Sequence, residues 1–175
     1  MQDFLTVDPD AKDCLQINAI LLDPSCSGSG TKTTRMDFLL PCGEENSHSG
    51  IVCSPDNNEQ FPGPTSNNTQ RVKSLAAFQS RALQHALKFT NVQRIVYSTC
   101  SVYVEENENV VAAVLPEAEA AGFRLVRALP FWHRRGLTSA FPWADNLVRV
   151  HPVLDGGDGF FVAVFDREHV CGTPV

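Results

Sequence analysis

Short apolar runs, separated by polar turns that contain glycine, predict the strands of this chain. Residues 17–22 (INAILL) form an apolar run rich in branched side chains, which predicts a buried strand. Similar runs at 94–97 and 123–126 predict two further strands. Near the end, 146–150 and 159–165 flank a glycine-rich turn, so we expect them to pair as an antiparallel hairpin.

Apolar residues spaced by three and four positions predict two helices between these strands. The first covers 72–87, and the basic residues on its polar face favour a solvated surface. Those residues are Arg71, Lys73, Arg81 and Lys88. The second helix begins near Val104 and presents a row of valines on one face. We expect Pro116 to end or restart it, because proline cannot donate a helical hydrogen bond.

The order strand, helix, strand, helix, strand and hairpin predicts an α/β fold around a mostly parallel sheet. In such sheets, ligands bind beyond the carboxyl ends of the strands. Residues 41–70 are rich in Pro, Gly, Ser and Asn, and we expect them to form a long mobile loop.

Charge is unevenly distributed over the 175 residues. The net charge of −6 argues against nucleic-acid binding through bulk charge alone. Residues 1–60 hold three basic and ten acidic side chains, whereas 71–135 hold nine basic and five acidic. If the chain has a nucleic-acid surface, that surface lies in the second stretch. No apolar run approaches the roughly 18 residues of a membrane span.

Six cysteines are scattered too widely for a small disulfide scaffold, which favours reduced thiols in a cytosolic or nuclear protein. They are Cys14, Cys26, Cys42, Cys53, Cys100 and Cys171. The sequence contains no Cys-x-x-Cys pair, which a zinc site normally brings. A loop site built from Cys42, His48 and Cys53 is the weaker alternative.

Two of these cysteines follow predicted strands. Cys26 lies three residues after Asp23 in a turn with two glycines, and Cys100 follows the second strand just before a helix. A helix start can lower a thiol's pKa, although Glu105 and Glu106 would oppose this effect at Cys100. Taken alone, each cysteine is more simply interpreted as a residue that packs in the protein interior. Cys26 would then lie in a helix-capping turn. Together, at the ends of two strands, they suggest a two-thiol active site.

The two motifs, DPSCSGSG and VYSTCSVYVEENENVV, resemble those of the Sun-domain RNA methyltransferases. The residues of the two motifs are most similar to those of the family's ribosomal-RNA branch, which is related to the fifth mammalian member of the family. This resemblance implies a Rossmann-like sheet that ends in an antiparallel hairpin, and S-adenosylmethionine as methyl donor. It further implies ribosomal RNA as partner, no metal, no membrane association and a nucleolar location in the nucleus. The reaction would be 5-methylcytosine formation.

The resemblance also implies a role for four residues. Cys100 would supply a thiolate that adds to carbon-6 of cytosine, and Cys26 would assist the elimination that frees the methylated RNA. Asp23 would bond ring nitrogen-3 close to the methyl donor, and Asp3 would contact the donor's adenine. The target base must leave its stack to reach such a pocket, which favours unpaired or locally opened RNA.

In the family pattern, the glycine-rich loop that holds the donor precedes the position of Asp3. Residues 1–175 are therefore expected to form the carboxyl-terminal half of a methyltransferase catalytic domain. The alternative is a truncated, non-catalytic form that binds RNA or a partner. A redox or zinc module that uses Cys26 and Cys100 is a third hypothesis.

Overall fold

A computed structural model describes residues 3–31, 64, 68–137 and 141–168. Its sheet has the order β1-β2-β5-β3, and a further strand, β4, pairs with β5. The strands are β1 (Ala19–Leu22), β2 (Arg94–Thr99), β3 (Phe123–Val126), β4 (Val148–Val150) and β5 (Phe160–Arg167). The helices are α1 (Thr69–Ala86) and α2 (Glu108–Ala120). Each predicted strand is therefore present.

The sheet is mixed rather than mostly parallel in the part of the chain that the structure describes. β1 and β2 are parallel, whereas β5 is antiparallel to β2, β3 and β4. The hairpin is confirmed, with Val148 opposite Val162. Its second strand also runs through the sheet between β2 and β3, which the pattern did not predict. β5 can occupy this position because Phe161, Ala163 and Phe165 are fully buried.

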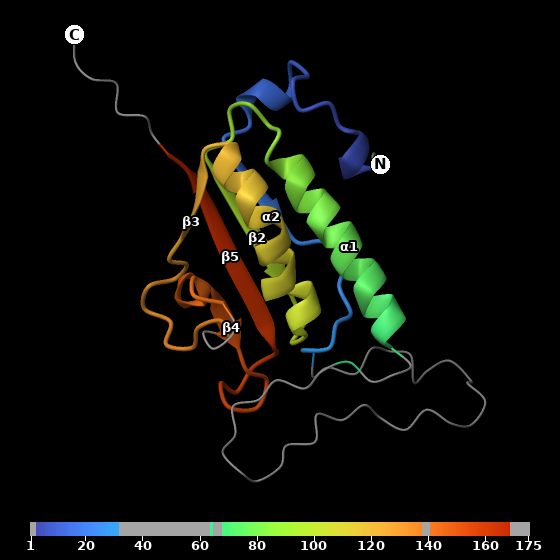
Figure 1. The fold of residues 1–175 in the computed structure, drawn as a ribbon, viewed down its shortest axis with the longest axis vertical. Coiled ribbons are helices and arrows are strands. Elements are labelled where there is room, and N and C mark those ends of the chain that lie inside the picture. Colours follow the sequence, from blue (N-terminus) through green and yellow to red (C-terminus); the bar gives the residue numbers. More distant parts are fainter. Residues whose placement is uncertain (1–2, 32–63, 65–67, 138–140, 169–175) are drawn as a thin grey trace.

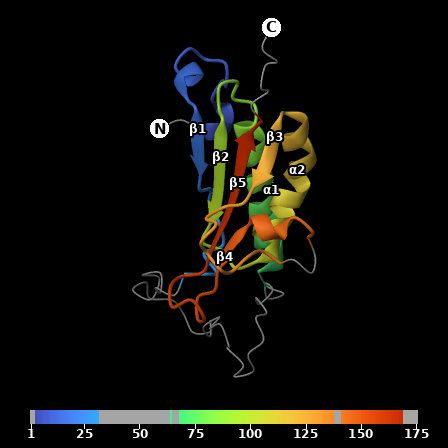
Figure 2. The ribbon, with the colours of Figure 1, turned by 90° about the vertical axis from the view of Figure 1, so that its left-hand side faces the viewer.

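Both helices pack on the same face of the sheet (Figures 1 and 2). Their buried residues recur at helical spacing, as the sequence predicts. They meet buried side chains of β2 and β5 to form one core. Its largest members include Leu83, Phe89, Ile95, Tyr97, Phe123, Leu147, Phe161 and Phe165. Arg71, Lys73, Arg81 and Lys88 are exposed, which agrees with a solvated helix face.

Two predictions about the second helix are wrong. Glu105 and Glu106 belong to a separate 3-10 turn, η4 (Val104–Glu106), and α2 begins at Glu108. α2 also continues through Pro116, because Val114 and Ala118 on either side of it are fully buried. Packing against the core thus outweighs the loss of one backbone hydrogen bond.

The predicted loop at 41–70 lies mostly outside the described residues. Of this stretch, the structure describes Pro64 and residues 68–70, and Thr69 and Gln70 already form the first turn of α1. The three residues of the alternative zinc site, Cys42, His48 and Cys53, also lie outside. Within the described ranges, no cluster of three His, Cys, Asp or Glu side chains could hold a metal ion. No described helix is long and apolar enough to cross a membrane.

Candidate active site

The two cysteine loops meet at the carboxyl ends of the parallel pair β1 and β2. Leu22 lies opposite Tyr97 in the register, so the segments that follow these strands leave the sheet side by side. The Sγ atoms of Cys26 and Cys100 are 2.9 Å apart, and both residues are half-buried. The structure thus brings together the two thiols that the sequence places on separate strand ends.

Glu106 holds the two cysteine loops together. Its side chain is fully buried, and its Oε1 accepts hydrogen bonds from the backbone N–H of Ser27 at 2.9 Å and from Nε2 of Gln79 at 3.0 Å. Its Oε2 accepts a hydrogen bond from the hydroxyl of Ser101 at 2.7 Å. One carboxylate therefore connects the Cys26 loop, the Cys100 loop and α1. The sequence indicates Glu106 only as a charge near Cys100 and gives no sign of this role.

Three serines form a second connection between the loops. Ser29 Oγ and Ser101 Oγ are 3.0 Å apart, and the hydroxyl of Ser27 donates to that of Ser101 at 3.2 Å. The backbone N–H of Val102 donates to Ser29 Oγ at 3.1 Å. Because each serine lies within three residues of a cysteine, these bonds fix the backbone next to both sulfurs.

The backbone of Gly30 continues this contact into the β4–β5 turn. Gly30 N–H donates to the carbonyl of Cys100 at 2.9 Å, and its own carbonyl accepts from Gly159 N–H at 2.8 Å. A Cβ atom on Gly30 would lie 2.5 Å from the carbonyl oxygen of Gly159. Gly30 thus admits the close approach of the protein's own backbone, which a side chain at this position would block.

The turn after Cys100 is further fixed from α2 and β4. Asn107 accepts a hydrogen bond from the Thr99 hydroxyl at 2.6 Å and donates to the Ser101 carbonyl at 2.8 Å. The guanidinium of Arg149 is buried and donates to the Val102 carbonyl at 2.8 Å and to both carboxylate oxygens of Glu108 at 2.7 and 2.5 Å. The Cys100 loop is thus held on both sides.

The surroundings of Cys26 favour its protonated form. Burial, followed by the hydrogen bond to Cys100, raises the pKa of Cys26 to about 12. Cys26 therefore keeps its proton at neutral pH, and its S–H group can donate to the sulfur of Cys100.

The structure places the two aspartates in separate segments of the fold. Asp23 follows β1 directly, is exposed, and accepts a hydrogen bond from the Ser98 hydroxyl at 3.3 Å, so it lies beside the cysteine loops. Asp3 caps the 3-10 turn η1 (Phe4–Thr6) by accepting from Leu5 N–H at 3.1 Å. Phe4 packs on His85 near the carboxyl end of α1. Asp23 therefore lies beside the cysteine loops, and the contact of Asp3 with the donor stays a prediction.

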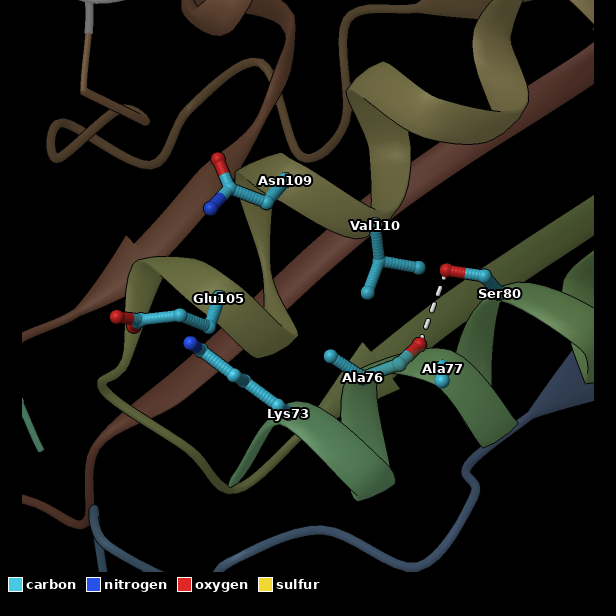
Figure 3. Close-up of a pocket in the computed structure, with 7 residues that line it drawn as sticks. All are labelled: Lys73, Ala76, Ala77, Ser80, Glu105, Asn109 and Val110. Carbon is cyan, nitrogen blue, oxygen red and sulfur yellow. Dashed lines mark hydrogen bonds between the residues drawn. The ribbon is translucent and has the colours of Figure 1, made fainter. Parts of the chain in front are cut away.

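A pocket of about 290 Å³ lies between α1, η4 and α2 (Figure 3). Neither cysteine lines it. Figure 3 shows Lys73 reaching toward Glu105, whose Oε2 is buried without a hydrogen-bond partner. The lining residues are Lys73, Ala76, Ala77, Ser80, Glu105, Asn109 and Val110.

Fold and site together define an α/β protein with two facing thiols at the carboxyl edge of its sheet. The family model described as 16S rRNA methyltransferase RsmB/F matches residues 64–166. This chain belongs to that family, and the resemblance drawn from the two cysteine motifs is confirmed.

Curated relatives match almost the whole chain. The 25S rRNA (cytosine-C(5))-methyltransferase NSUN5 of Arabidopsis thaliana is 47% identical over 98% of this chain and 27% of its own length. A 28S rRNA (cytosine-C(5))-methyltransferase of Mus musculus is 41% identical over 99% of this chain and 32% of its own length. The chain therefore spans about a third of the length of these relatives.

Solved structures share the fold. A methyltransferase homologue from Pyrococcus horikoshii superposes with a TM-score of 0.55 at 23% identity and covers 88% of this chain and 41% of its own. NSun6 from the same organism, solved with SFG, gives 0.53 at 20% identity over 85% of this chain and 29% of its own. This likeness confirms the predicted methyltransferase-type α/β fold.

Proposed function

We propose that this chain supplies the two-thiol site of an enzyme that methylates carbon-5 of cytosine in ribosomal RNA. The observation that carries the proposal is the 2.9 Å approach of Cys26 and Cys100 at the carboxyl edge of the sheet. The names of the Arabidopsis and mouse relatives, which match nearly all of this chain, support the reaction and the RNA class. A substrate in the ribosome also supports a nuclear, nucleolar site of action.

Cys100 is the nucleophile in this proposal. Carbon-5 of cytosine is a weak nucleophile, and addition of a thiolate at carbon-6 turns the ring into an enamine-like species whose carbon-5 can attack a methyl group. Covalent addition thus replaces one difficult step by easier ones. The fixed backbone on both sides of Cys100 supports this role, because it holds the sulfur in one position for attack.

Cys26 assists the release of the methylated RNA. After a base has taken the carbon-5 proton, the bond between carbon-6 and sulfur breaks and its electron pair returns to the Cys100 sulfur. The raised pKa of Cys26 keeps an S–H group beside that sulfur. Its hydrogen bond stabilises the charge that develops on the leaving thiolate.

In this proposal, Asp23 contacts both the target cytosine and the methyl donor. Its carboxylate is exposed at the site, and Ser98 is its hydrogen-bond donor among the described contacts, so acceptor capacity remains for a ligand. We assign it the protonated ring nitrogen-3 of the cytosine adduct and a place beside the donor. When bound, S-adenosylmethionine supplies an electrophilic methyl group. Asp3 is exposed and keeps its predicted contact with the donor's adenine as a separate prediction.

A chimera tests this proposal. This chain replaces the matching third of the mouse 28S rRNA methyltransferase, and the transfer of a labelled methyl group to 28S rRNA is measured. We expect methylation by the chimera, loss with Cys100→Ala, and retention with Cys14→Ser, because Cys14 lies in η2 (Cys14–Gln16) before β1.

Two outcomes would contradict the proposal. One is methylation by the Cys100→Ala chimera at the unsubstituted rate. The other is a chimera that folds and binds RNA but transfers no methyl group, which would favour the non-catalytic alternative.

A further inference from the structure

The two sulfurs of the site are close enough to bond to each other. They are 2.9 Å apart, and a disulfide has a sulfur separation of about 2.05 Å, so a closure of about 0.9 Å would join them. The loops that carry the sulfurs are already held together by the backbone bond from Gly30 to Cys100 and by Glu106. Little chain entropy is therefore lost on closure.

We infer that Cys26 and Cys100 form a reversible disulfide with small-molecule disulfides of the glutathione class as oxidant, which makes the site a redox modification site. The Cys100 sulfur attacks the small disulfide, forms a mixed disulfide and releases one small thiol. The Cys26 sulfur then attacks Cys100, and the second small thiol leaves. Two electrons pass to the oxidant, and the two cysteine protons end on the two small thiols.

The surroundings of Cys26 favour this order of steps. Burial is the largest cause of the raised pKa of Cys26, and the hydrogen bond and charge of the free Cys100 raise it further. Burial remains in the mixed disulfide, but both contributions of Cys100 disappear. The pKa of Cys26 then falls, its thiolate fraction rises, and resolution by the neighbouring sulfur becomes faster.

The disulfide itself does not depend on the proposed reaction, but its consequence does. A Cys100 sulfur bonded to Cys26 cannot add to cytosine. Oxidation would therefore stop methyl transfer, and a thiol reductant would restore it. Cys14 is the matched control, because it is a free, half-buried cysteine that lies in η2, before the amino end of β1.

The test uses the whole chain. It is treated with oxidised glutathione, its free thiols are blocked with N-ethylmaleimide, and it is digested without reductant for mass spectrometry. We expect one linked peptide pair that joins Cys26 to Cys100 and disappears with dithiothreitol. Cys14→Ser should leave its yield unchanged. Cys26→Ser should stop at a mixed disulfide between Cys100 and glutathione.

Two results would overturn the inference in the native chain. One is a stable glutathione adduct on Cys100 with Cys26 alkylated, and the other is a link that joins either cysteine to a different one. If Cys26→Ser does not fold, as judged by circular dichroism, the peptide map of the native chain still decides. If the native chain forms the Cys26–Cys100 disulfide but the reduced chimera transfers no methyl group, only the proposed function is refuted.

Discussion

Glu106 and Glu108 are two residues apart and fully buried, yet they are held in different ways. Glu106 accepts hydrogen bonds from neutral groups, namely the Ser27 amide, the Gln79 amide and the Ser101 hydroxyl. Glu108 forms a two-pronged ion pair with Arg149. The first arrangement binds the two cysteine loops to each other, and the second binds α2 to β4.

The difference separates the needs of the site from those of the scaffold. A cation beside the cysteines would change the charge on both sulfurs, whereas neutral donors position the loops without adding charge. A guanidinium can be used in the scaffold, where Arg149 stabilises the buried Glu108 carboxylate and orders the Val102 carbonyl. Substitutions of Glu106 and of the Glu108–Arg149 pair should therefore differ in their relative effects on the free energy of unfolding and on disulfide formation between Cys26 and Cys100.

The largest effect is expected from Arg149→Met. The variant leaves Glu108 buried without its cation, which should lower the free energy of unfolding by about 3–5 kcal/mol. Urea denaturation followed by circular dichroism measures it. The double variant Glu108→Gln with Arg149→Met should regain part of the loss. A loss under about 1 kcal/mol in the single variant would show that the pair is dispensable.

Glu106→Gln should have a smaller effect on stability and a clearer one on the thiols. The amide can still accept from Ser27 and Gln79, but its NH₂ group cannot accept from the Ser101 hydroxyl. We expect a loss of about 1.5–3 kcal/mol, because one bond to a charged group is removed. The yield of the Cys26–Cys100 disulfide should also fall, as peptide mapping can measure. Glu108→Gln should leave that yield unchanged, and equal loss in both variants would refute the distinction.

Asp155 offers a carboxylate on the β4–β5 turn whose contribution can be titrated. Burial would raise its pKa, but hydrogen bonds from Arg134 and the His151 amide outweigh burial and lower it to about 2. Because the folded value lies below the usual 3.8, its stabilisation is present above pH 4 and lost as the pH falls toward 2.

The expected loss from Asp155 over that range is about 2 kcal/mol. Denaturation at a series of pH values checks it, with Asp155→Asn as control. The variant should be less stable than the native chain at pH 6 and differ little from it near pH 2. An Asp155→Asn chain whose stability falls with acid as steeply as that of the native chain would contradict the assignment.

The sequence predicted the local elements because their signals are local. The strand at 123–126 and the helix around 72–87 follow from the apolar spacing of their own residues. The central position of β5 did not, because it depends on which strands accept Phe161 and Phe165 in the core. Likewise, Pro116 was wrongly expected to end or restart α2, since burial on either side of it is a tertiary effect.

At the site, the cysteines were found because each follows a strand and matches a family motif. Glu106 was not found, because its partners Ser27, Gln79 and Ser101 come from three separate parts of the chain. A buried glutamate has no signature of its own in a run of acidic residues such as EENE at 105–108. Asp3 was grouped with the site by resemblance, and its contact with the donor's adenine stays a prediction; in the structure it caps the η1 turn, whose Phe4 packs on His85.

The most direct test of the proposed mechanism is a trap for the covalent intermediate. In the mouse chimera that carries Cys26→Ala, release should fail, and a protein–RNA complex should migrate slowly on a denaturing gel. Adding Cys100→Ala should remove the complex. A Cys26→Ala chimera that turns over normally with no complex, or a complex that survives the loss of Cys100, would contradict the account.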